Sequence, residues 1–125
     1  MSELYREIIL EHYKNPHNYG SLEKPDASII DTNPLCGDTI TLEINCDENE
    51  TLSDVAFISR GCALSVASAS ILSDSVKGKN IKDIEMMNYN DMQDLLEMKV
   101  GVGRAPCVLL PLSALHKAIK NIKKN

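Results

Sequence analysis

The stretch Thr39-Ile40-Thr41-Leu42-Glu43-Ile44-Asn45-Cys46 alternates strictly between polar and apolar residues. Successive side chains of an extended chain point to opposite sides, so its apolar residues share one face. They are Ile40, Leu42, Ile44 and Cys46. The pattern predicts a β-strand with one buried and one wet face. It also predicts that Cys46 is a small core hydrophobe, as free cysteines usually are.

Two further strands are expected beside this one. A polar turn over residues 47–50 leads into a second apolar run from Leu52 to Arg60, and the two runs predict a hairpin. A shorter strand is expected from Ala27 to Asp31. An antiparallel sheet with one wet face needs helices on its other face. The predicted fold class is therefore α+β, a small antiparallel sheet packed by helices.

Helices are expected before and after these strands. The first runs from Ser2 to about Asn15 and stops at Pro16, and a second, rich in alanine and serine, runs from about Ala63 to Val76. Residues 81–85 and 90–98 are shorter candidates, with Asn80 and Asn90 as their predicted N-caps. The final helix is expected to open at Cys107, with Pro111 in its first turn.

Length and composition indicate one domain over residues 1–125. The sequence is 43% hydrophobic and 25% charged, which is typical of a globular protein in water. The net charge of −5 argues against nucleic acid as a partner, because phosphate binding needs a concentrated basic face. No stretch resembles a membrane span or a secretory signal, so we expect a cytoplasmic protein without a membrane partner.

A turn precedes the central strand and carries two potential metal ligands. In Asn33-Pro34-Leu35-Cys36-Gly37-Asp38, a thiol and a carboxylate stand two residues apart. A thiolate is a soft donor suited to zinc or iron–sulfur chemistry, whereas a carboxylate is harder and holds such metals more loosely. The turn therefore suggests a site that binds soft metal and can release it.

Cys36, Cys62 and Cys107 each lie at a junction between predicted elements, the last two at helix starts. The N-terminus of a helix favours thiolate, the form that binds metal or attacks sulfur. Arg104 would add to this effect at Cys107 if its loop folds back; the alternative is an exposed loop residue. No paired C-x-x-C exists, which disfavours a finger-like zinc site. The spacing leaves open a shared metal site or three unrelated thiols.

Taken together, these motifs resemble the U-type iron–sulfur scaffold family, which includes IscU, SufU and the N-terminal domain of NifU. The resemblance runs almost end to end, in the same order and at the same intervals. It covers Leu4-Tyr5 through Tyr19-Gly20, the turn from Asn33 to Asp38, Gly61-Cys62-Ala63-Leu64-Ser65-Val66-Ala67-Ser68-Ala69-Ser70, and Arg104 to Cys107 followed by a helix.

The resemblance implies a function and a ligand set. It implies that sulfur arrives from a cysteine desulfurase and that a transient [2Fe–2S] cluster is built for acceptor proteins, with Cys36, Cys62 and Cys107 as thiolate ligands and Asp38 as a labile fourth. In the SufU branch the same ligands hold zinc and relay sulfur, which would make the protein a sulfurtransferase rather than a non-enzymatic scaffold. Cys36 is the expected sulfur acceptor and Arg104 a supporting residue. A non-catalytic module with structural zinc is a rival from another class.

The sequence departs from both branches. Pro106 stands where IscU proteins have a histidine, and residues 101–105 do not reproduce the chaperone-binding segment of that branch, so a dedicated chaperone is not expected. The Arg104-x-x-Cys107 arrangement is similar to SufU, yet the insertion usual in SufU between the second and third cysteines is missing. The chain therefore stands between the branches.

Overall fold

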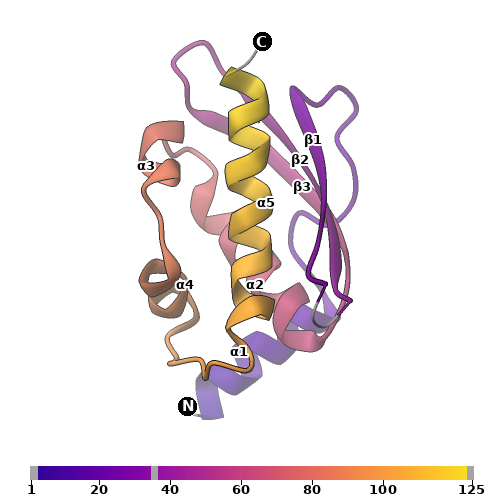
Figure 1. Ribbon diagram of the computed structural model, residues 1–125, viewed down its shortest axis with the longest axis vertical. Coiled ribbons are helices and arrows are strands. Elements are labelled where there is room, and N and C mark those ends of the chain that lie inside the picture. Colours follow the sequence, from indigo (N-terminus) through magenta and orange to yellow (C-terminus); the bar gives the residue numbers. More distant parts are fainter. Residues whose placement is uncertain (1–2, 35–36, 124–125) are drawn as a thin grey trace.

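The computed structural model describes residues 3–34 and 37–123 (Figure 1). Three strands and five helices follow one another along this part of the chain. In order they are α1 (Glu3–Lys14), β1 (Ala27–Thr32), β2 (Thr39–Cys46), β3 (Leu52–Arg60), α2 (Ala63–Val76), α3 (Ile81–Glu85), α4 (Tyr89–Leu96) and α5 (Ala105–Lys123). The α+β class and the three strands predicted from the sequence are confirmed.

The strands form an antiparallel sheet in the order β1-β2-β3. β2 is the middle strand, and its Leu42 stands opposite Ile29 of β1 and Phe57 of β3. Its alternating apolar residues are buried, as their period of two requires. Cys46 is only half-buried at the end of β2, where the register shifts, and it packs against the rim of the core.

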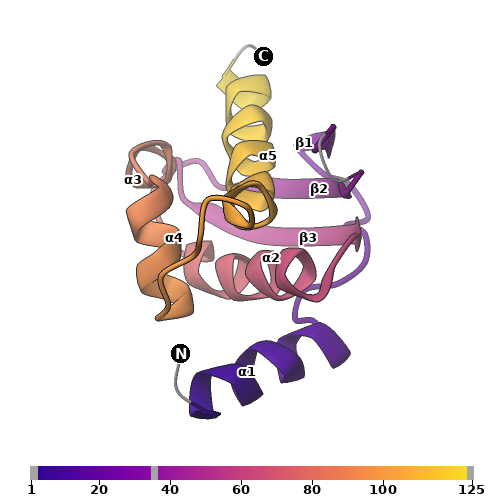
Figure 2. The same ribbon diagram turned by 60° about the horizontal axis from the view of Figure 1, so that its bottom comes forward.

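Helices α2 and α5 pack against the sheet, and α1 packs against α2 (Figure 2). α2 therefore has neighbours on both sides: β3 and α5 on one and α1 on the other. Its small residues allow this close approach, and ten of its fourteen residues are buried. Within the described part of the chain, no helix combines the length and the apolarity needed to cross a membrane.

The predicted N-cap is right for α3 and wrong for α4. Asn80 caps α3 as expected, but α4 is capped by Asn88 and not by Asn90. Asn88 accepts a hydrogen bond from the backbone of Asp91, whose side chain accepts one from the backbone of Asn88 in return. This reciprocal capping box satisfies two backbone amides at the start of α4.

The prediction that Pro111 lies in the first turn of the last helix is wrong. α5 begins at Ala105, so Pro111 falls in the helix interior. Proline has no N–H, so the carbonyl of Cys107 receives no hydrogen bond from the residue four positions later. The helical ladder is thus interrupted directly after the third predicted cysteine ligand.

Candidate metal centre

Three of the predicted ligands meet at one end of the molecule. Asp38 immediately precedes β2, Cys62 immediately precedes α2, and Cys107 lies in the first turn of α5. One ligand atom from each lies within 4.8 Å of the others. Antiparallel pairing of β2 and β3 explains part of this, because Thr39 stands opposite Arg60 and brings the start of one strand to the end of the other.

The carboxylate of Asp38 is buried and held by two neighbours. Its Oδ2 accepts a hydrogen bond of 2.5 Å from the hydroxyl of Ser65. On its other side is Gly61, where an added Cβ would lie only 2.7 Å from the carboxyl carbon of Asp38. Real Cβ atoms do not come this close, so the position of Asp38 requires glycine at residue 61.

Cys62 is the N-cap of α2, and its surroundings favour the thiolate form. The backbone N–H of Ser65 donates to its sulfur at 3.4 Å, and the hydroxyl of Ser65 is also 3.4 Å away. Burial of the sulfur opposes ionisation, but hydrogen bonds from Ser65 and Cys107 outweigh it and lower the pKa of Cys62. Cys62 is also exposed, so an ion or a second protein can reach it.

The pKa of Cys107 is shifted in the opposite direction. Burial and the hydrogen bond that its thiol gives to Cys62 raise the pKa of Cys107 to about 11. The expectation that the start of a helix lowers the pKa is therefore right for Cys62 and wrong for Cys107. The physical reason is that one proton is held between two sulfurs, which makes Cys62 the acceptor and Cys107 the donor. A metal ion that binds both sulfurs must displace this proton.

Two other residues predicted for the site, Arg104 and Cys36, are not among the three that the structure brings together. Arg104 is exposed and lines a pocket together with Cys62, Ala63, Leu64 and Cys107. The groups that shift the pKa values of the two thiols are their neighbours and each other, and Arg104 is not among them. Cys36 lies outside the described residues, so its part in the site stays a prediction.

Sequence reasoning gave no role to Ser65 and Gly61, which hold the centre together. Ser65 contacts both Asp38 and Cys62, and Gly61 makes room for the carboxylate. Both belong to the stretch from Gly61 to Ser70 that carried the resemblance. The position of Ser65, three residues after a cap, is also where a capping box places its second residue.

Two sulfurs and a carboxylate oxygen are donors suited to zinc or to an iron–sulfur cluster. Zinc–ligand bonds of about 2.0–2.3 Å place neighbouring donors about 3.5 Å apart. Donor atoms already within 4.8 Å of one another need only small movements to reach this spacing. A fourth ligand is needed to close a tetrahedral site, and Cys36 stands two residues before Asp38. The residues present therefore fit such a group.

The fold and this donor set define a small α+β protein with a candidate soft-metal centre at one end of its sheet. Comparison with known families makes the class specific. Residues 4–125 match the NifU-like N terminal domain. The chain therefore belongs to this family, as the resemblance in its motifs indicated.

Several curated relatives are similar over nearly the whole chain. The iron-sulfur cluster assembly enzyme IscU of Drosophila melanogaster is 34% identical, with 96% of this chain and 79% of the relative covered. The zinc-dependent sulfurtransferase SufU of Bacillus subtilis (strain 168) is 36% identical, with 95% and 91% covered. The iron-sulfur cluster assembly scaffold protein IscU of Haemophilus influenzae is 32% identical, with 95% of both covered.

Solved structures agree with the family assignment. An N-terminal NifU-like protein from Brucella abortus superposes with a TM-score of 0.79 at 25% identity, covering 97% of this chain and 95% of its own. A SufU-type scaffold protein from Fervidobacterium islandicum AW-1 gives a TM-score of 0.74 at 26% identity, covering 95% and 99%. The NifU-like protein and the SufU-type protein thus share this fold.

Proposed function

We propose that this protein assembles iron–sulfur clusters: it accepts sulfur from a cysteine desulfurase, builds a transient [2Fe–2S] cluster on Cys36, Cys62, Cys107 and Asp38, and transfers it to acceptor proteins. The observation that carries the proposal is the convergence of Asp38, Cys62 and Cys107 within 4.8 Å. Relatives named as cluster assembly proteins, 32–34% identical over nearly the whole chain, support it.

Sulfur enters by exchange between a persulfide and a thiolate. A thiolate of this chain attacks the outer sulfur of the persulfide on the desulfurase; the old S–S bond breaks, the desulfurase cysteine leaves as a thiolate, and a new persulfide forms on this chain. We assign this step to Cys36. Of the two described thiols of this centre, Cys62 and Cys107, Cys62 is the alternative acceptor, because it is exposed and its pKa is lowered. Transfer of radiolabelled sulfur to Cys36→Ser at the full level would refute the first assignment.

Release of the cluster is assigned to Asp38. Thiolates hold iron–sulfur clusters firmly, whereas a carboxylate is a weaker ligand for this metal. Asp38 also has a second partner in Ser65, 2.5 Å away. When Asp38 leaves the metal, its charge is therefore still stabilised by a hydrogen bond. This arrangement lowers the cost of opening one coordination position.

The second candidate function is a zinc-dependent sulfurtransferase. It is favoured by the 36% identity to the relative named as one and by the same donor set. Zinc bound by these residues would stabilise the thiolate form of the cysteines, which is the form that attacks a persulfide during sulfur relay. Cys62, which is more exposed than Cys107, is suited to leave the metal and attack a persulfide.

Metal analysis of protein prepared without air separates these functions. A red-brown protein with iron and sulfide supports the scaffold, and a colourless protein with one tightly bound zinc supports the relay. A protein whose cysteine variants all unfold, while Asp38→Ala keeps full function, would instead be an interaction module with structural zinc. We place the activity in the cytoplasm, where thiols stay reduced, and without a dedicated chaperone.

A further inference from the structure

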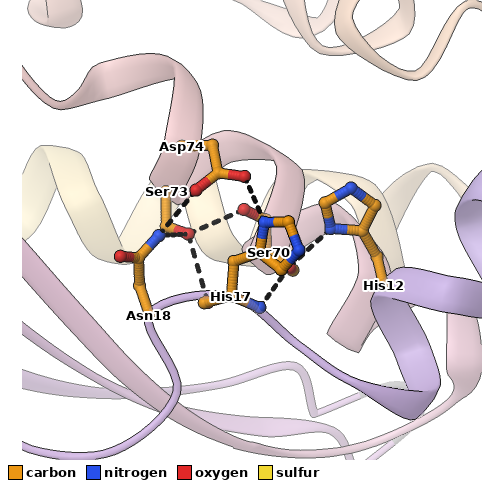
Figure 3. Close-up of polar contacts among 6 residues, drawn as sticks. All are labelled: His12, His17, Asn18, Ser70, Ser73 and Asp74. Carbon is orange, nitrogen blue, oxygen red and sulfur yellow. Dashed lines mark hydrogen bonds and ion pairs between the residues drawn. The ribbon is translucent and has the colours of Figure 1, made fainter.

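A second group of metal-ligand side chains lies outside this centre. His12 near the end of α1, His17 in the following loop and Asp74 in α2 each offer one ligand atom, and these atoms lie within 4.8 Å of one another (Figure 3). We call these three residues the histidine cluster. Asp74 is twelve residues beyond Cys62, which is about 18 Å along α2. The two groups of ligands are therefore separate.

Hydrogen bonds orient both imidazole rings. Nδ1 of His17 lies 2.5 Å from Oδ2 of Asp74, and Nδ1 of His12 lies 2.7 Å from the hydroxyl of Ser70. The same hydroxyl accepts the backbone N–H of His17 at 2.8 Å, so Ser70 joins the two histidines. The ring centroids are 4.4 Å apart. The two rings thus lie next to each other, with their planes tilted by 47°.

The carboxylate of Asp74 is also held in place. The side-chain amide of Asn18 donates to its Oδ1 at 2.9 Å and to the hydroxyl of Ser73 at 2.8 Å. Asn18 has a left-handed backbone with φ of 60°, a conformation that asparagine adopts more readily than most residues. This turn sets the loop against α2. Partners that orient ligand side chains in this way are a regular feature of metal sites.

The chemistry of the histidine cluster is that of a transition-metal site. Two imidazole nitrogens and one carboxylate oxygen bind zinc and ferrous iron and leave further positions open for water. Bonds of about 2.0–2.2 Å place such donors about 3.4 Å apart. Side chains that are half exposed can close the remaining gap: 51% of the His17 side chain and 46% of the Asp74 side chain are accessible.

The charges of the cluster also favour a cation. Among the described residues, the only ion pair of Asp74 is with His17, and it exists only while that ring is protonated. A bound ion would take the place of the contact between His17 and Asp74.

We propose that His12, His17 and Asp74 form a second metal site, which takes a divalent ion of the zinc or ferrous iron type and fastens the loop after α1 to α2. The site does not depend on the function proposed for the cysteines. It can therefore be tested by metal binding alone.

The test is a zinc titration of the full, metal-free, reduced protein, followed by the imidazole ¹⁵N resonances. The chain has three histidines, and His116 serves as an internal control because its Nε2 already contacts the carbonyl of Ile84 at 2.9 Å in another part of the fold. The thiolates bind zinc in their own site. One further equivalent of zinc should shift the ¹⁵N resonances of His12 and His17, whereas the resonances of His116 should not shift.

Substitutions of single carboxylates test whether Asp74 is a ligand of this second site. Asp74→Asn should weaken this equivalent roughly 10- to 100-fold, as loss of a ligand or of its orienting partner does. Asp54→Asn is the matched control: it makes the same charge change at an exposed carboxylate of β3, and binding should stay within about twofold of the parent. Cobalt bound in place of zinc shows whether each variant is folded. A thiolate-to-cobalt charge-transfer band as strong as that of the parent indicates an intact cysteine centre.

Two results would overturn the proposal. One is that His12 and His17 do not respond to zinc while the thiolate site fills; their hydrogen bonds to Ser70 and Asp74 would then serve only to tie α1 and its following loop to α2. The other is that Asp54→Asn weakens the second equivalent as much as Asp74→Asn, which would mean general attraction of cations to surface carboxylates.

Discussion

Replacing Gly61 by alanine tests how the centre is built. The new Cβ would lie 2.7 Å from the carboxyl carbon of Asp38 and 2.9 and 3.0 Å from its two oxygens. The residue can adopt the backbone conformation, since φ at Gly61 is not in the left-handed region. The collision must therefore be relieved by moving Asp38, whose carboxylate is hydrogen-bonded to Ser65 at 2.5 Å.

The expected loss of stability follows from two opposing effects. Separating a hydrogen bond to a charged group costs about 1.5–3 kcal/mol. Alanine in place of glycine stabilises by about 0.4–1 kcal/mol, because it restricts the unfolded chain. The net change is a loss of about 1–2 kcal/mol, or roughly 4–8 °C in Tm for a chain of this length.

Thermal unfolding of the metal-free protein measures this change, and Gly103→Ala is the matched control. A Cβ at Gly103 meets nothing within 4 Å, and its φ is not left-handed either. We expect the control to be as stable as the parent or slightly more stable. Metal affinity should fall in Gly61→Ala and not in Gly103→Ala, because only the former displaces a ligand.

A double-mutant cycle shows whether Asp38 is the cause. In an Asp38→Ala background the carboxylate is gone, so Gly61→Ala should cost little or nothing. The reasoning is refuted if Gly61→Ala is as stable as Gly103→Ala. It is equally refuted if the substitution costs the same with and without Asp38.

Other predictions concern the same centre and one helix cap. Asp38→Ala should make a bound cluster longer-lived, because the weakest ligand is gone; an unchanged decay of the cluster's visible absorbance would count against Asp38 as a ligand. In the metal-free protein, Cys62 should be alkylated before Cys107 near neutral pH, and the rate at Cys107 should still rise as the pH approaches about 11, since a raised pKa keeps that thiol protonated. Ser65→Ala should slow the alkylation of Cys62, because the variant loses the side-chain hydrogen bond that helps to lower the pKa of this thiol and keeps only the backbone N–H of residue 65; peptide mapping by mass spectrometry follows both thiols. Asn88→Ala should cost about 1 kcal/mol in urea unfolding through loss of the cap of α4, with no effect on metal content.

Local patterns were enough to predict most of the elements. The bounds of β2, β3, α2 and α3 agree with the periodicity and the turn residues, because each depends on neighbours within a few positions. The errors lie where a choice between adjacent residues depended on the surrounding chain. Asn88 and Asn90 are both suitable caps, and the capping box with Asp91 decides between them. Pro111 was misplaced because the helix start at Ala105 is itself fixed by hydrogen bonds to the carbonyl of Gly101.

By itself, the sequence determined the strands, the helices, the family and the residue types available for metal chemistry. Periodicity, turn residues and motif order are properties of neighbouring positions, so they can be read without coordinates. Only the tertiary structure decided that Asp38 is buried against Gly61, that Ser65 links it to Cys62, and that the pKa of Cys62 is lowered while that of Cys107 is raised. It also brought His12 and His17 to Asp74. These contacts join segments far apart in the chain, and their distances are set by how the helices pack on the sheet, which no local pattern contains.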